Sequence, residues 1–167
     1  MYSFNDRMFT LIAGTEKREF KVDRRRLGNS SMYLEKTLEQ DWEEGQKKRV
    51  PLEDVEPHTL RCYLHLLYTG TILCCEQVDA TESKNLENYD PIFQGSTSIE
   101  DLDMHTQEYD LLANLYVLGE RLMDGRLKDA VVDAIIAKVN EFDENGDAWY
   151  PTISTVHIMY KGTPNNS

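Results

Sequence analysis

Residues 108–123 form a stretch that is apolar on every side when it is drawn as an α-helix. One face carries Tyr109, Leu112, Ala113, Tyr116 and Val117, and the opposite face carries Leu111, Leu115, Leu118 and Leu122. A helix that is apolar all round must be covered by other elements rather than lie on a surface. The chain is therefore expected to fold around a buried central helix, and 167 residues are enough to enclose one.

The residues before this helix predict a small sheet with several helices. Apolar side chains alternate over residues 8–23 around Gly14, which is typical of a β-hairpin. Residues 24–38 predict two short helices with a break near Gly28, the second capped by Ser30, and residues 48–52 predict a short edge strand. A longer helix begins at Pro57 and ends at Gly70. With two more helices over residues 126–139 and 151–160, the fold class is α+β, a mostly helical cluster with a small sheet.

An acidic segment interrupts this pattern at about residues 75–107. Between Cys75 and Glu108 there are nine acidic residues and one lysine, a net charge of -8, and no sustained apolar periodicity. We expect a long, mobile insertion, because such a segment has little apolar surface to bury.

Charge and cysteine content restrict the partners and the compartment. The net charge of -12 disfavours a nucleic-acid partner, and no apolar run is long enough to predict a membrane span. Three cysteines, two of them adjacent, are not a disulfide framework, and the first residues lack the pattern of a signal peptide. We expect a protein of the cytosol or nucleus.

Three segments in this order resemble the BTB/POZ domain. They are residues 20–23 leading to Leu27 and Ser31, residues 54–70 with their Tyr-Thr-Gly ending, and the pair 116–118 and 127–130. With residues 160–164, the chain is similar to the stand-alone BTB proteins of filamentous fungi. The resemblance implies a BTB/POZ fold over residues 8–139, with the acidic insertion at about 75–107 and residues 140–167 as a C-terminal extension.

The resemblance also implies a function in protein–protein interaction without catalysis. In BTB adaptors of ubiquitin ligases, a hydrophobic-x-Glu motif before the third strand contacts a cullin, and Trp42 and Glu44 match that motif. The alternative that Trp42 packs on its own domain stays open. The competing roles are a homodimerising scaffold, a transcription-related interaction domain without a ligase role, and the less similar F-box-binding adaptor of the same superfold.

A weak homodimer is expected from two positions of the family's usual interface. BTB homodimers often pair an acidic residue at the start of the first strand with a basic residue that opens the first helix. Arg24 matches the basic position, but Met8 stands at the acidic one. A dimer would therefore need an interface rebuilt with apolar contacts from Met8 and Leu27.

Two other residue clusters are candidates for metal binding or for docking. His58, Cys62 and His65 share one helical face, which we expect to be exposed, and they are the candidate ligands of a zinc-binding protein or zinc enzyme. The second Cys or His pair of a zinc motif is absent, so we expect no metal, no cofactor and no catalytic site. The basic residues between 17 and 26 predict a solvated surface with local ion pairs, with docking of an acidic partner or of the acidic insertion as the alternative.

Overall fold

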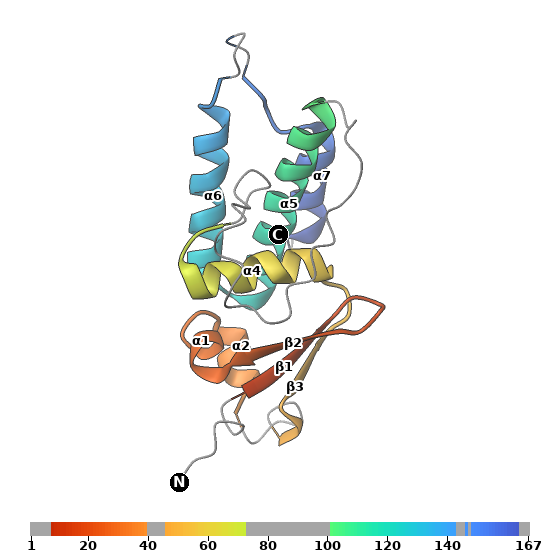
Figure 1. Cartoon of the computed structure of the whole chain (residues 1–167), viewed down its shortest axis with the longest axis vertical. Coiled ribbons are helices and arrows are strands. Elements are labelled where there is room, and N and C mark those ends of the chain that lie inside the picture. Colours follow the sequence, from red (N-terminus) through yellow and green to blue (C-terminus); the bar gives the residue numbers. More distant parts are fainter. Residues whose placement is uncertain (1–7, 40–45, 73–100, 143–145, 147, 164–167) are drawn as a thin grey trace, which may run out of the picture.

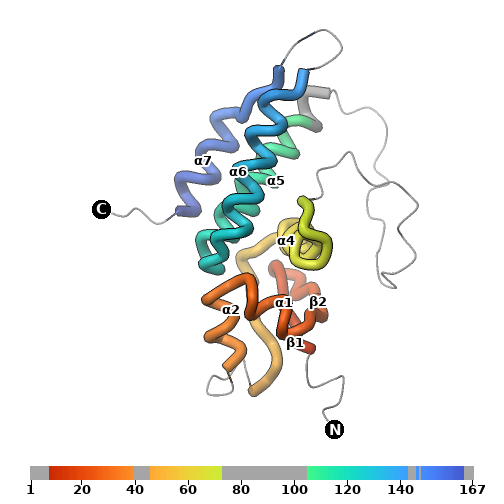
Figure 2. Tube along the Cα trace, turned by 90° about the vertical axis from the view of Figure 1, so that its left-hand side faces the viewer, coloured from red at the N-terminus to blue at the C-terminus, as the bar shows by residue number. Residues whose placement is uncertain are grey.

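The computed structural model describes all residues except 1–7, 40–45, 73–100, 143–145, 147 and 164–167, and it leaves out the side chains of residues 101–104. The strands are β1 (Met8–Ala13), β2 (Arg18–Asp23) and β3 (Arg49–Leu52). The helices are α1 (Arg24–Gly28), α2 (Met32–Thr37), α4 (Pro57–Thr69), α5 (Asp101–Leu122), α6 (Gly125–Val139) and α7 (Ile153–Gly162). The sheet with α1 and α2 lies at one end, α5, α6 and α7 lie at the other, and α4 lies between them (Figures 1 and 2).

The three strands pair in the order β2-β1-β3. The hairpin is confirmed: β1 and β2 are antiparallel, with Leu11 opposite Phe20. The predicted edge strand is also confirmed, and β3 pairs with β1 in parallel, with Leu11 opposite Val50. Alternate side chains of β1 and β3 are buried, so one face of the sheet covers the core and the other faces outward.

The two short helices after the hairpin are present, but the predicted cap of the second is wrong. Ser31, rather than Ser30, caps α2, because its Oγ accepts a hydrogen bond from the Leu34 backbone N–H at 3.0 Å. Ser30 belongs to the end of α1, where its Oγ donates to the carbonyl oxygen of Arg26 at 2.8 Å. The capping role falls to the serine that takes the extended conformation, and that is Ser31.

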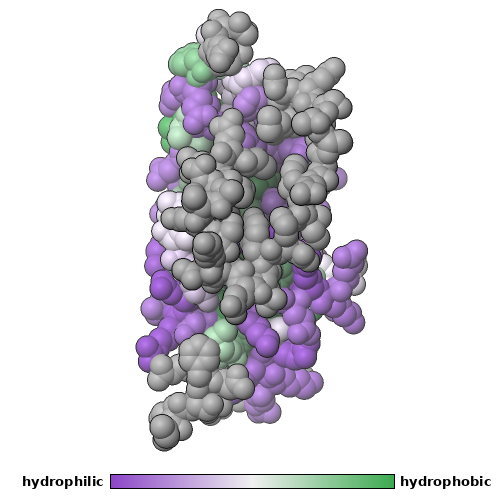
Figure 3. Space-filling view, in the orientation of Figure 1, coloured by the Kyte–Doolittle hydropathy of each residue, from purple (hydrophilic) through white to green (hydrophobic). Residues whose placement is uncertain are grey.

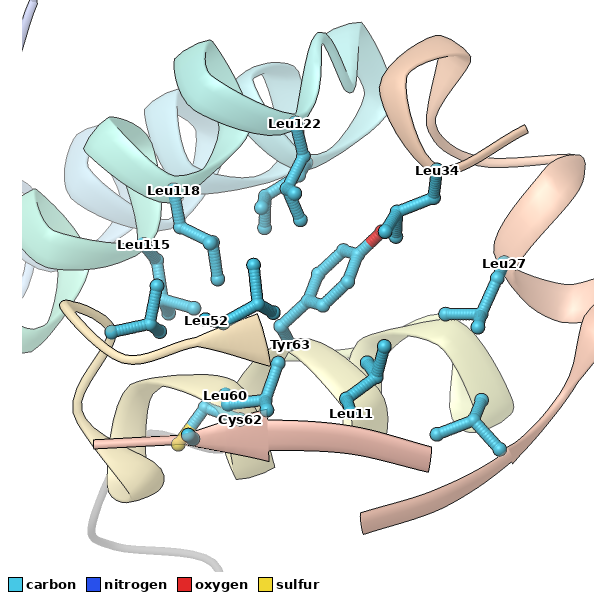
Figure 4. Close-up of a cluster of buried hydrophobic side chains, with 14 of the residues drawn as sticks. Leu11, Leu27, Leu34, Leu52, Leu60, Cys62, Tyr63, Leu115, Leu118 and Leu122 are labelled. Atoms are coloured by element: carbon cyan, nitrogen blue, oxygen red, sulfur yellow. The ribbon is translucent and has the colours of Figure 1, made fainter. Parts of the chain in front are cut away.

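Helix α4 has the predicted ends and supplies the centre of the core. Pro57 occupies its first turn, and Gly70 ends it in the left-handed region at φ 80°, where its N–H donates to the carbonyl of Leu66 at 2.8 Å. The Tyr63 side chain is fully buried. Leucines from the sheet, α1, α2 and α5 surround it in Figure 4, so one core joins all these elements.

Helix α5 is the buried central helix, and it begins seven residues earlier than predicted. Leu112, Leu115 and Leu122 are fully buried, and α5 packs against both α6 and α7. The expectation that residues 101–107 belong to an insertion without regular structure is wrong. His105, in the second turn, stacks on Trp149 with ring centroids 4.7 Å apart. Packing against a residue distant in sequence thus supports a turn whose own composition is polar.

The last helix packs on the core rather than extending away from it. It covers Ile153–Gly162, two residues later at each end than predicted, so Gly162 is helical and not terminal coil. Thr155 Oγ1 donates to Asp110 Oδ1 of α5 at 2.6 Å. A Cβ atom at position 162 would lie 2.4 Å from the Val117 methyl groups, so α7 needs glycine there to approach α5 this closely.

Candidate interaction site

A buried polar network holds α2, α4, α5 and α6 together, and we call these packed helices the platform. Asp124 is 1% exposed and caps α6, because its Oδ1 accepts from the Leu127 backbone N–H at 3.1 Å. Its Oδ2 accepts from the Tyr63 hydroxyl of α4 at 3.1 Å. Ser31 Oγ, at the start of α2, donates to the carbonyl oxygen of Leu122. These bonds tie α2 and α4 to the junction of α5 and α6, because leaving any of these groups unpaired inside the core would be unfavourable.

Burial and the adjacent carboxylate keep Tyr63 protonated. Desolvation, together with the charge of Asp124 and the hydrogen bond to it, raises the pKa of the Tyr63 hydroxyl well above its ordinary value of 10.0. The hydroxyl is therefore protonated at neutral pH and can donate to Asp124.

A second buried polar cluster, between α5 and α6, was not expected from the sequence. Lys138 Nζ donates to Glu108 Oε2, and both side chains are almost fully buried. The same ammonium lies 3.3 Å from His105 Nδ1 and 5.6 Å from the centroid of the Tyr109 ring. The Tyr109 hydroxyl donates to the carbonyl oxygen of Trp149 at 2.6 Å, which attaches the chain before α7 to α5. Helical periodicity gives no sign of this cluster, because Lys138 lies about 30 residues after the α5 residues that it contacts.

The segment that carries the predicted cullin motif joins two well-anchored elements. Trp42 and Glu44 themselves lie outside the described residues. Before them, Leu38 caps the end of α2 and is 1% exposed, and after them Val50 of β3 is equally buried. Both ends of the segment are thus held on the core, while the contacts of Trp42 and Glu44 stay a prediction.

The three residues considered for a dimer interface differ in exposure. Met8 is half-buried at the start of β1, opposite Asp23. Arg24 is exposed at the start of α1, and within the described part of the chain its side chain has no ion pair or hydrogen bond. Leu27 is fully buried in the protein's own core. Leu27 therefore offers no surface to a second copy. The expectation that Leu27 supplies an apolar contact to a dimer interface is wrong.

Of the three residues on the proposed metal-binding face, His58 is exposed as expected, but His65 is half-buried and Cys62 is buried. Cys62 is 3% exposed and belongs to the core, because α4 is covered on two sides by the sheet and by α5. His65 Nδ1 lies 3.1 Å from both Thr71 O and Thr69 Oγ1. Partial burial and the charge of Arg61 lower the pKa of His58. Among the described residues no three His, Cys, Asp or Glu side chains form a group that could hold a metal ion.

Exposed apolar side chains gather on the two outer helices. On α7, Ile153 is 90% and Tyr160 75% exposed, and a shallow groove between α7 and α5 is lined by Tyr116, Met159 and Tyr160, among others. On the other side, Val132, Ile136 and Phe142 are exposed on and after α6, where Figure 3 shows hydrophobic surface at the upper left.

The comparison with protein families decides the assignment of this fold. The model of the BTB/POZ domain matches residues 5–89, about half of the chain. The chain belongs to the BTB/POZ family. BTB/POZ domains are protein–protein interaction modules and not a catalytic fold, and they also mediate dimerisation. No curated protein matches this BTB/POZ chain. In the described part of the chain, none of the helices combines the length and apolar content needed to cross a bilayer.

Proposed function

We propose that this BTB/POZ protein is an adaptor or scaffold that docks a cullin through the segment between α2 and β3. The observation that carries the proposal is the Trp42-Glu43-Glu44 sequence at that place in a BTB/POZ chain. The buried ends of the segment support it, because Leu38 and Val50 limit how far Trp42 can lie from the platform.

The proposed roles of the two side chains differ. Trp42 fills an apolar pocket on the cullin, as aromatic anchors do at the centre of interfaces. Glu44 accepts hydrogen bonds at the rim of that pocket, where a charge mainly affects the rate of association.

The test measures binding of purified cullin to three variants. Truncating a buried aromatic anchor costs about 2–4 kcal/mol, so Trp42→Ala should weaken binding about 30- to 900-fold. Glu44→Ala should have a smaller effect, and Glu43→Ala is the matched control that should leave binding unchanged. A sharp fall in the melting temperature of Trp42→Ala would identify Trp42 as a core residue instead. Absence of any cullin binding by the wild-type chain would overturn the adaptor role.

The second candidate is a homodimerising scaffold without a ligase role. The exposed Met32 and Tyr33 of α2 and the exposed Arg24 of α1 favour it. However, burying Arg24 without an acidic partner would cost about 3–5 kcal/mol, and Leu27 is not available to compensate. We therefore expect weak association by light scattering at micromolar concentration. A dimer that persists on dilution would favour the scaffold.

A further inference from the structure

The outer edge of β2 carries backbone groups that no described strand pairs with. Strand β2 ends the sheet on one side. The backbone N–H groups of Thr10, in β1, and Gly14, in the turn after it, donate to the carbonyl oxygens of Lys48 and Leu52. The backbone N–H and C=O groups of the even-numbered residues of β1 therefore point toward β3, and those of the odd-numbered residues point toward β2. In the antiparallel hairpin, Phe20 and Val22 lie opposite odd-numbered residues of β1, so their backbone groups form the hydrogen bonds to β1.

The N–H and C=O groups of Glu19 and Lys21 consequently point away from the sheet. Asp23 has the same orientation, and its N–H donates outward to the Tyr68 hydroxyl at 3.3 Å. This bond confirms the direction in which the alternate residues of β2 point, and it marks where the open edge ends.

The opposite edge of the sheet differs. In the parallel pair of β1 and β3, the backbone of Ile12 forms hydrogen bonds with the residues on either side of Pro51. The backbone groups of Pro51 itself therefore point away from β1, toward the open edge. Proline has no N–H, and it interrupts the row of donors on the edge of β3. Of the two edges, that of β2 is the better template for an added strand.

The side chains along β2 are strongly basic and unpaired. Within the described residues, no ion pair or hydrogen bond involves the side chains of Lys17, Arg18, Lys21, Arg24 and Arg25, and the expected local ion pairs among residues 17–26 are not formed. Of the carboxylates in this row, Glu19 pairs across the sheet with Arg49, and Asp23 accepts a hydrogen bond from the Arg25 backbone N–H at 2.8 Å. Five unpaired cations in nine residues contrast with a chain whose net charge is -12.

We propose that the outer edge of β2 binds an acidic, extended segment of a partner protein by strand addition. The outward N–H and C=O groups of Glu19 and Lys21 supply the main-chain hydrogen bonds. The unpaired cations select for acidic side chains, and they repel a second copy of the same edge, as charges on edge strands do. A strand rises about 3.3 Å per residue, so β2 from Arg18 to Asp23 spans about 17 Å, the length of a six-residue extended segment. This surface does not include Trp42 or Glu44, so it is independent of the proposed cullin contact.

The charge requirement is tested with a fluorescein-labelled octapeptide of alternating valine and glutamate and a matched valine–lysine peptide. Anisotropy with the full chain should show binding of the glutamate peptide alone, and the affinity should fall as salt is raised from about 50 to 300 mM. The double variant Lys21→Gln/Arg24→Gln should bind about two- to tenfold more weakly. The control variant Lys36→Gln/Lys161→Gln, with the same change in net charge, should bind as the wild type does. Equal effects of the two variants, or no binding at millimolar peptide, would overturn the proposal.

The edge itself is tested by comparing Lys21→Pro with Lys21→Gln. Both remove the cation, but only proline removes the outward N–H, and neither disturbs the bonds of Phe20 and Val22 to β1. Lys21→Pro should abolish peptide binding, and hydrogen exchange of the wild type should show new protection at the Glu19 and Lys21 amides. Unchanged exchange at these amides would refute strand addition even if Lys21→Pro failed to fold. Binding that appears only after deletion of residues 76–100 would show that the chain's own acidic segment takes the edge, and would overturn the assignment to a partner.

Discussion

Replacing Asp124 by alanine should destabilise the protein more than any single exposed substitution, because it removes two buried interactions. The carboxylate caps α6 through Leu127 and accepts the hydroxyl of Tyr63. Loss of an N-cap costs about 0.5–2 kcal/mol. The orphaned Tyr63 hydroxyl, in a side chain with no exposed surface, adds about 1–3 kcal/mol.

The expected total for Asp124→Ala is about 2–4 kcal/mol of unfolding free energy. For a chain of this length, each kcal/mol lowers the melting temperature by about 2–4 °C, so the shift should be about 4–16 °C. Asp124→Asn should cost less, because asparagine caps helices as well as aspartate does.

Urea unfolding followed by tryptophan fluorescence measures these differences. Asp133→Ala, an exposed change on the same helix, is the control and should stay within about 0.5 kcal/mol of the wild type. Tyr63→Phe in the Asp124→Ala background should cost little further, because the hydroxyl it removes has already lost its partner. Strict additivity of the two changes, or a cost for Asp124→Ala below about 0.5 kcal/mol, would refute the network.

Three further outcomes are expected. Ser31→Ala should lower the unfolding free energy by about 1 kcal/mol or more, whereas Ser30→Ala should have little effect, and the reverse order would restore Ser30 as the cap. Lys138→Ala should cost about 3–5 kcal/mol because it leaves the Glu108 charge buried alone, while Lys138→Met combined with Glu108→Leu should recover most of that loss. The hydrogen bond from Arg121 lowers the pKa of Asp54 below 3.8, so its small contribution should be present above about pH 4 and lost as pH falls through the folded pKa. Stability curves of wild type and Asp54→Asn that run parallel from pH 6 to 2 would contradict this last outcome.

The elements that the sequence predicted correctly are those with local causes. The hairpin follows from period-two alternation around a turn, and α4 follows from a proline at its start and a glycine at its end. The core role of α5 follows from apolar residues on every face, which require cover whatever the partners are.

The errors concern features that depend on distant partners. The first turns of α5 are polar, and His105 is held by Trp149, which lies 44 residues later. The burial of Cys62 could not be read from its helix alone, because it depends on α4 being covered on two sides. Ser30 and Ser31 are equivalent as residue types, and the length of α1 decides between them.

The parallel pairing of β3 with β1 has a consequence for the order in which this fold assembles. Hairpin β1–β2 closes a turn of four residues, an event of microseconds for an isolated hairpin. Strand β3 reaches β1 only after α1, α2 and the intervening chain have been brought together, at the entropic cost of a loop of more than thirty residues. On a ribosome the hairpin can form as soon as residue 23 has emerged, while the third strand waits for residue 52. Until then the edge of β1 that later pairs with β3 is open, and this is the stage at which a nascent chain is most exposed to wrong pairing.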